Sequence, residues 1–219
     1  MRIKINLQIF LFSIIFLFMH QIKIYACIMV FAFFHELGHL LAGIVLKLKP
    51  KKIELMPFGF SIIFEDYGYR KLIEVKRISI ALAGPITNII IAIIAYYLKI
   101  NYEIKMIIIH SNILIFIFNM FPMYPLDGGR ILKGILKMCL NNEKADDLTY
   151  KISNILMILL TTFSSILILY HKNISILFII TYLWIIVVRE NKRYNLKKRM
   201  YKILQNDYKT AKCIDIWKI

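Results

Sequence analysis

The chain has 219 residues, 59% of them hydrophobic, and a formal net charge of +16 at pH 7. Soluble domains contain about 45–50% apolar residues, so this composition excludes an ordinary soluble protein. The basic residues flank apolar stretches and form no soluble basic domain, which argues against nucleic acid as a partner.

Six apolar stretches approach the roughly 20 residues that a transmembrane helix needs. In chain order they are Ile5–Met19, Ile24–Leu46, Ile78–Leu98, Met106–Leu126, Ile152–Tyr170 and Ile174–Val188. We therefore predict an all-α polytopic membrane protein with about six transmembrane helices in residues 1–188. We interpret residues 1–19 as a retained membrane segment rather than a cleaved signal peptide, because the hydrophobic sequence continues past Cys27.

Lysine and arginine residues are distributed unevenly between the two sides that six spans define. Twenty-five of the 29 fall on one side, and only Lys23, Lys99, Lys105 and Lys172 fall on the other. The positive-inside rule makes the richer side cytoplasmic, so we predict that both termini are cytoplasmic.

The segment between the second and third stretches has strand character. Lys52–Met56 and Ser61–Phe64 are rich in β-forming residues and are joined through Pro57-Phe58-Gly59. This pattern predicts a small β-hairpin at the membrane surface, and a simple amphipathic connection is the alternative.

Residues 189–219 form a basic tail in which aromatic and aliphatic residues alternate with lysine and arginine. This pattern is typical of a helix lying on an anionic leaflet, and the tail is too short to form a domain with its own core. The cysteines, Cys27, Cys139 and Cys213, form no spaced pair and predict no disulfide framework.

The pentapeptide His35-Glu36-Leu37-Gly38-His39 lies inside the second apolar stretch. Two histidines four residues apart share one face of a helix, where they can hold zinc while the intervening glutamate serves as general base. An ionisable residue at membrane depth costs several kcal/mol unless it is paired or coordinated, so a purely structural Glu36 is disfavoured.

A catalytic zinc ion needs a third protein ligand, and Asp127 is the strongest candidate. It lies within residues 118–130, at the end of the fourth apolar stretch, where two prolines and two glycines would break the helix. Irregular backbone at membrane depth is tolerated where protein buries it or a watery cavity meets it, so a broken helix end could bring this carboxylate to a metal. The alternative is a turn-forming aspartate before Gly-Gly.

Two asparagines are further candidates for the site. Asn119 could hydrogen-bond the substrate or the reacting oxyanion, or it could tie helices together. Asn88, with the small residues of Ala83-Gly84-Pro85, either packs helices or supports the active site. His20, His110 and His171 have no motif partner, and we expect them to be interfacial.

The pentapeptide, together with the Asn119-x-x-Pro122-x-x-Pro125-Leu126-Asp127-Gly128-Gly129-Arg130 segment, resembles the site-2 protease family of intramembrane zinc metalloproteases, peptidase family M50. Ala83-Gly84-Pro85-x-x-Asn88 is similar to the middle-span pattern of that family. The resemblance covers residues 31–132 and places a catalytic core at about residues 24–135. It implies one Zn²⁺ per chain, with His35, His39 and Asp127 as metal ligands and Glu36 as the catalytic residue.

Six spans and no PDZ domain most resemble the sporulation branch of the family, the stage IV sporulation protein FB type. Residues 54–59 are similar to the hairpin of that branch. The resemblance implies removal of the pro-sequence of a late mother-cell sigma factor at the outer forespore membrane. The branch often carries a C-terminal CBS domain, which we do not expect here, so a nucleotide response is not implied.

We expect the partners to be a protein substrate with a membrane-associated segment, the lipid bilayer and membrane inhibitor proteins, and an oligomer is compatible with this reading. One alternative is cleavage of another membrane-anchored regulator, such as an anti-sigma factor. An alternative of another class is a non-proteolytic metal transporter or scaffold. Glu36 disfavours the latter, because a metal-carrying site needs no base to activate water.

Overall fold

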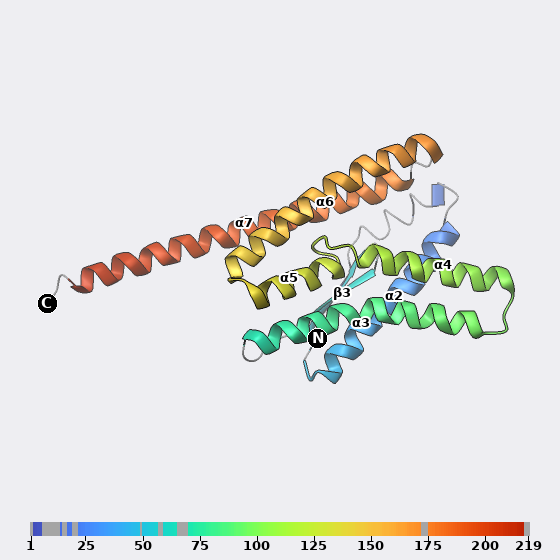
Figure 1. Ribbon diagram of the computed structural model, residues 1–219, viewed down its shortest axis with the longest axis horizontal. Helices are drawn as coiled ribbons and strands as arrows, with labels where there is room; N and C mark the ends of the chain where they lie inside the picture. The colour runs from blue at the N-terminus through green and yellow to red at the C-terminus, as the bar shows by residue number, and fades with distance from the viewer. Residues whose placement is uncertain are drawn as a thin grey trace. The chain divides into compact units, whose positions relative to one another are not determined.

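The structure is a computed structural model that describes residues 2–5, 14, 17–18, 22–48, 50–56, 59–64, 70–171 and 175–216 (Figure 1). The chain divides into two compact units, Met1–Ser165 and Ile166–Ile219. The elements are β1 (Arg2–Ile5), α2 (Ile22–Val45), β2 (Pro50–Met56), β3 (Gly59–Phe64), α3 (Arg70–Tyr97), α4 (Tyr102–Asn119), α5 (Asp127–Cys139), α6 (Asn142–His171) and α7 (Ser175–Ile216).

Among the described residues, four helices are long and apolar enough to cross a bilayer, α2, α3, α4 and α6. The prediction of a mostly helical, integral membrane protein is confirmed to that extent. The first predicted span, Ile5–Met19, lies almost entirely outside the described residues. The sixth, Ile174–Val188, begins outside them and otherwise falls in α7, which is not among the four helices found in the described part of the chain.

The fourth span was predicted to reach Leu126, and this boundary is wrong. Helix α4 ends at Asn119, where the amide groups of Met120 and Phe121 donate to the carbonyl groups of Phe116 and Phe118. Pro122 follows, and proline can neither donate a backbone hydrogen bond nor leave the preceding residue free to be helical. The chain then enters a seven-residue loop, residues 120–126, before α5 begins.

The strands form one three-stranded sheet in the order β1-β2-β3. Strand β2 pairs antiparallel with β3, with Ile53 opposite Ile62, and the connection at residues 57–58 lies outside the described residues. Strand β1 pairs parallel with β2, with Ile3 opposite Ile53. The sequence analysis did not anticipate β1, because its four residues merge with the apolar stretch that follows them.

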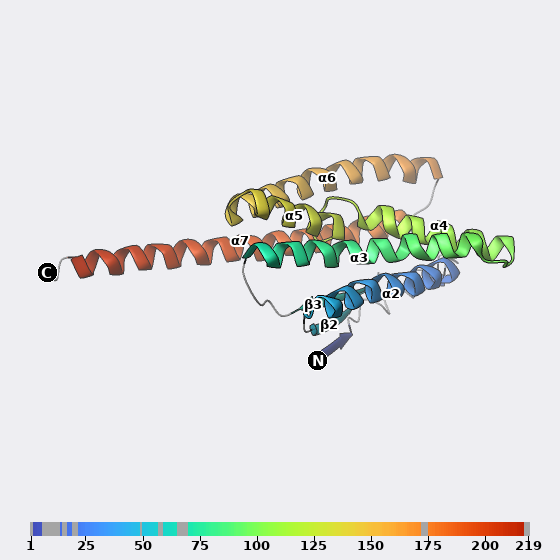
Figure 2. The same cartoon turned by 60° about the horizontal axis from the view of Figure 1, so that its bottom comes forward.

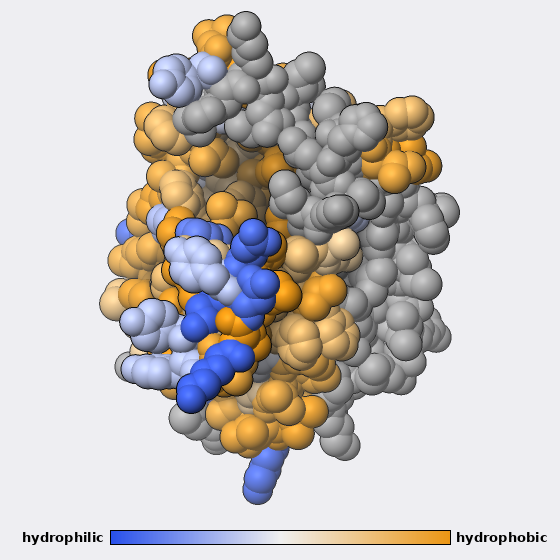
Figure 3. Space-filling model, turned by 90° about the vertical axis from the view of Figure 1, so that its right-hand side faces the viewer, coloured by the Kyte–Doolittle hydropathy of each residue, from blue (hydrophilic) through white to orange (hydrophobic). Residues whose placement is uncertain are grey.

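Helix α3 is central in the first unit and packs against α2, α4 and α5 (Figure 2). The sheet lies along α2 through β3. Large apolar side chains point outward at helical spacing, as at Ile86, Ile90 and Ile93 of α3, each about half exposed. Figure 3 shows such hydrophobic side chains surrounding a small hydrophilic group at the end of the molecule that carries the α3–α4 connection. This surface is typical of helices that face lipid.

In the second unit, the predicted sixth span and most of the basic tail form one continuous helix, α7. Within the described residues the helix runs from Ser175 to Ile216 without a break.

Candidate metal centre

Helix α2 places two imidazole rings one turn apart on the same face. The Nε2 atoms of His35 and His39 lie 3.1 Å apart, and both side chains are buried. The Nδ1–H of His39 donates to the carbonyl oxygen of Ile80 on α3 at 2.7 Å. Since a carbonyl only accepts, Nδ1 carries the proton in the neutral ring, and the Nε2 lone pair of His39 is free for a metal.

The broken end of α4 brings a carboxylate to these rings. Asp127 is the first residue of α5, directly after the loop of residues 120–126. A Cβ at Gly128 would lie 2.5 Å from the carbonyl oxygen of Phe121, and a Cβ at Gly129 would lie 2.6 Å from that of Met123. Only glycine therefore lets the loop fold back onto the first turn of α5, with Asp127 held 5% exposed.

The three side chains converge on one point. Asp127 Oδ2 lies 2.9 Å from His35 Nε2 and 3.0 Å from His39 Nε2. Zinc bonds of about 2.0–2.2 Å at a tetrahedral angle put ligand atoms about 3.3 Å apart. The observed separations fall only a few tenths of an ångström short of that value, and the donor set of two imidazoles and one carboxylate suits zinc. These three side chains could therefore hold a metal ion, because their ligand atoms lie close together.

Gly84 lets helix α3 approach the two histidines. A Cβ at Gly84 would lie 2.7 Å from His35 Nε2 and closer still to His39 Nε2. One turn away, a Cβ on Gly38 would lie 2.9 Å from the carbonyl oxygen of Ala83. Glycines on both helices thus allow α2 and α3 to touch beside the candidate ligands, which accounts for the small-residue patch of the sequence.

The second carboxylate oxygen of Asp127 faces a cation. Arg130, one turn further along α5, places Nη1 3.5 Å from Asp127 Oδ1. The two oxygens of one carboxylate therefore point to different partners, Oδ2 to the histidines and Oδ1 to Arg130. This arrangement limits rotation of the carboxylate about its bond to Cβ.

The other predicted site residues are placed as follows. Glu36 follows His35 on α2 and is half-buried. Asn119 is also half-buried and donates from Nδ2 to the carbonyl oxygen of Ile115, 3.1 Å away. Asn88 is fully buried on α3. Of the remaining histidines, His110 is exposed, His171 is the last residue of α6, and His20 lies outside the described residues.

The sequence analysis missed Asn112, which is fully buried on α4. Its Nδ2 donates to the carbonyl oxygen of Ile108 at 2.8 Å. The available signal was its spacing, since Asn112 precedes Asn119 by seven residues and so lies two turns away on nearly the same face.

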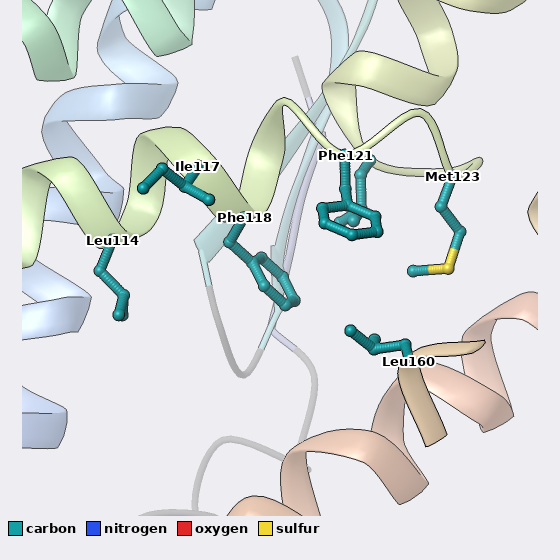
Figure 4. Close-up of a pocket in the computed structure, with 7 residues that line it drawn as sticks. Leu114, Ile117, Phe118, Phe121, Met123 and Leu160 are labelled. Carbon is teal, nitrogen blue, oxygen red and sulfur yellow. The ribbon is translucent and has the colours of Figure 1, made fainter. Parts of the chain in front are cut away.

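An apolar pocket of about 180 Å³ lies next to the loop that leads to Asp127. Phe118, Phe121 and Met123 point toward Leu160 of α6 in Figure 4. The lining side chains are all apolar, Leu114, Ile117, Phe118, Phe121, Met123, Leu126 and Leu160. The pocket therefore offers no metal ligand and is separate from the three converging side chains.

Comparison with known proteins finds several relatives of this chain. The chain is 30% identical to stage IV sporulation protein FB of Bacillus subtilis over 140 residues, which are 61% of this chain and 47% of the relative. It is 29% identical to a zinc metalloprotease of Methanocaldococcus jannaschii over 59% of this chain and 39% of that protein. The chain thus spans less than half the length of these two relatives.

A solved structure, the site-2 protease from Methanocaldococcus jannaschii, shares the fold. It superposes with a TM-score of 0.64 over 86% of this chain and 89% of that one, at 22% sequence identity. The model of the family described as peptidase family M50 matches residues 23–104 and 99–161, which include all three converging side chains. This match covers more than half of the sequence, and the chain belongs to peptidase family M50.

Proposed function

We propose that the chain is an intramembrane zinc endopeptidase that carries out regulated proteolysis. The observation that carries the proposal is that His35 Nε2, His39 Nε2 and Asp127 Oδ2 lie within 3.1 Å of one another. Glu36 lies on α2 between the two histidines. A curated relative is described as a zinc metalloprotease and the solved structure as a site-2 protease, and both descriptions support the same activity.

In this proposal, His35, His39 and Asp127 hold one zinc ion. Zinc bound there would polarise a water molecule and the scissile carbonyl group. Glu36 accepts a proton from the attacking water and later delivers it to the leaving amine, which makes it the general base and then the general acid. The burial of the three ligands keeps bulk water from competing for the site.

The proposed polar support for the substrate comes from Asn119 and Asn88. Because Asn119 uses one N–H on the carbonyl of Ile115, its Oδ1 and second N–H are open to a peptide backbone or to the developing oxyanion. Asn88 lies on α3, one turn after Gly84, the residue that faces His35 Nε2.

An extended substrate segment suits a hydrolytic site better than a helix, because a helix hides its amide bonds. Within the described residues, β2 is paired on both sides, whereas β3 is paired only with β2. We propose that the β2–β3 hairpin lies at the membrane surface and that the free edge of β3 takes up the substrate as an added strand.

The proposed substrate is the pro-sequence of a late sporulation sigma factor, with both chain termini in the cytoplasm and six spans in all. The similarity to stage IV sporulation protein FB supports this choice. Another membrane-anchored regulator, such as an anti-sigma factor, is the alternative substrate. Co-expression with candidate precursors, followed by an assay for a shift in size, distinguishes the two.

The test of the mechanism is E36Q in a strain that co-expresses a cleaved precursor. We expect cleavage to fall by about 10²- to 10⁴-fold, because the base is lost while the metal ligands remain. Zinc content, measured on the purified protein, should be unchanged. Undiminished cleavage by E36Q would contradict the proposed mechanism, and a metal transporter would lose little flux with the same change.

A second variant tests the third ligand. D127N replaces a charged donor with a neutral one and should lower zinc retention during dialysis against a chelator. E143Q, which neutralises an exposed acidic side chain at the start of α6, is the control for zinc content. Full zinc content in D127N would show that Asp127 is not a ligand.

A further inference from the structure

Four buried polar atoms near the candidate metal ligands have no hydrogen-bond partner among the described residues. They are His35 Nδ1, Asn88 Nδ2, Asn88 Oδ1 and Asn112 Oδ1. Buried polar atoms of this kind are rarely left unpaired, because each has given up its hydrogen bonds to water. They come from three neighbouring helices, α2, α3 and α4, which suggests one shared network.

Asn88 is placed to meet His35. Position 84 of α3 faces the Nε2 atom of His35, and Asn88 follows one turn later on the same side of that helix. Its side-chain amide lies within reach of the His35 ring. The Nε2 atom of His35 already faces Asp127 and His39, so Nδ1 is the ring atom left for Asn88.

Asn112 lies at the same depth as Asn88. Helices α3 and α4 are joined by only four residues, between Tyr97 and Tyr102. At 1.5 Å per residue, Asn88 lies about 13.5 Å from the end of α3 and Asn112 about 15 Å from the start of α4. Both side chains are 0% exposed, and α4 packs against α2 and α3.

We propose that Asn88 and Asn112 form a relay that positions His35. In the relay, rotation of the two buried amide groups lets the Nδ1–H of His35 donate to Asn88 Oδ1 and lets Asn88 Nδ2 donate to Asn112 Oδ1. Asn112 Nδ2 in turn donates to the carbonyl oxygen of Ile108, a hydrogen bond that is present at 2.8 Å. These two added hydrogen bonds satisfy all four atoms, with one donor for each acceptor.

The relay fixes the tautomer of His35. With the proton held on Nδ1, the lone pair of Nε2 points to the metal group, as the Ile80 carbonyl arranges for His39. Asn88 and Asn112 are therefore positioning residues that act through His35. The inference rests on the metal site of the proposed function and does not require proteolysis.

The experiment measures zinc affinity of the full chain in detergent by competition with a graded series of chelators. N88L keeps a side chain of similar shape but removes the acceptor, and it should weaken zinc binding by about 10- to 100-fold. N88D keeps the acceptor for Nδ1–H and should bind zinc nearly as well as the parent. N112L should cause a smaller loss than N88L, because it acts through Asn88.

The double variant N88L/N112L gives the sharpest result. In a relay, the second substitution has nothing left to break, so the double variant should bind zinc no more weakly than N88L. S164A, a buried polar change on α6, is the control and should leave zinc affinity unchanged. Parent-like zinc affinity in N88L, or losses that multiply in the double variant, would overturn the relay.

These outcomes are separable from those for the proposed function. If E36Q abolishes cleavage while N88L keeps parent-like zinc affinity, the protease stands and the relay falls. If N88L and its double variant behave as expected but no precursor is cleaved, the relay stands and the protease falls.

Discussion

Gly84 has no side chain beyond a hydrogen atom, and this allows α3 to lie against the candidate ligands. We expect G84A to weaken zinc binding by about 10-fold or more, because its methyl group would occupy space within 2.7 Å of His35 Nε2. Chelator competition on the purified chain measures the change. G134A is the matched control, since its methyl group would meet the side chain of Ile78 and not the two histidines. Equal zinc affinity in G84A and the parent would contradict this close approach.

The candidate ligands could be named from the sequence because their chemistry is encoded locally. The spacing within the pentapeptide puts both histidines on one face of the helix, and the prolines before Asp127 predict a break in the helix. The contact of Gly84 with the histidines and the burial of Asn112 depend on how α3 and α4 dock. No local sequence pattern predicts how these helices pack, so the positions of these two residues are known only from the structure.

At the scale of elements, α6 supports the loop that leads to Asp127. The backbone N–H of Tyr124 donates to Ser153 Oγ at 2.8 Å, and Ser153 is fully buried. S153A leaves that N–H without its acceptor and should lower the free energy of unfolding by about 1–3 kcal/mol. Thermal unfolding in detergent measures the loss. S165A, an exposed serine on the same helix, should change little, and equal effects of the two would contradict a specific role for Ser153.

A charged cluster also ties α5 to α6. Lys133 and Lys137 of α5 both contact Asp146 Oδ1, at 3.2 and 3.4 Å, and all three side chains are less than one-fifth exposed. D146A leaves two lysines facing each other, so unfolding free energy should fall by about 1.5–3 kcal/mol at neutral pH. E143A, an exposed glutamate at the start of α6, is the control.

The pH dependence of D146A follows from Lys137. Burial lowers the pKa of Lys137 below its usual value, so the folded state releases this proton before the unfolded state does. Stability lost to the charged lysine is therefore regained as pH rises through the lowered pKa. Unfolding measured at neutral and alkaline pH should show a smaller loss at alkaline pH. A loss that is constant or grows with pH would contradict this account.

Long elements were easier to predict than short ones. Helices α2 and α3 follow from apolar runs near bilayer length. Helix α5 was not predicted, because its glycines and lysines hide a one-sided apolar pattern over only 13 residues. Strand β1 is stabilised by its pairing with β2, and the sequence of four residues does not predict such long-range pairing.

At the scale of the whole molecule, charge distribution and site placement agree. His39 lies in the second half of α2, and Asp127 begins the helix after the end of α4. The basic loops predict that both of these ends are cytoplasmic, whereas the α3–α4 connection faces the other side. A site near the cytoplasmic end of its helices suits a substrate that approaches from the cytoplasm.

Two single cysteines test this orientation. Lys99 lies in the α3–α4 connection and Asn141 in the α5–α6 connection, and both are exposed. In a background with Cys27, Cys139 and Cys213 replaced by serine, K99C should react with a membrane-impermeant maleimide in intact cells. N141C should react only after permeabilisation, because the positive-inside rule places the five basic residues between Arg130 and Lys151 on the cytoplasmic side.

The control for both cysteines is denatured protein, in which each should react fully and so report equal expression. Labelling of N141C but not K99C in intact cells would reverse the orientation and turn the metal site toward the outside. Such a result would remove a cytoplasmic sigma-factor precursor from the candidate substrates and favour a regulator cleaved from the external side. The topology therefore decides which substrates can reach His35, His39 and Asp127, even though the geometry of those three side chains is the same in either orientation.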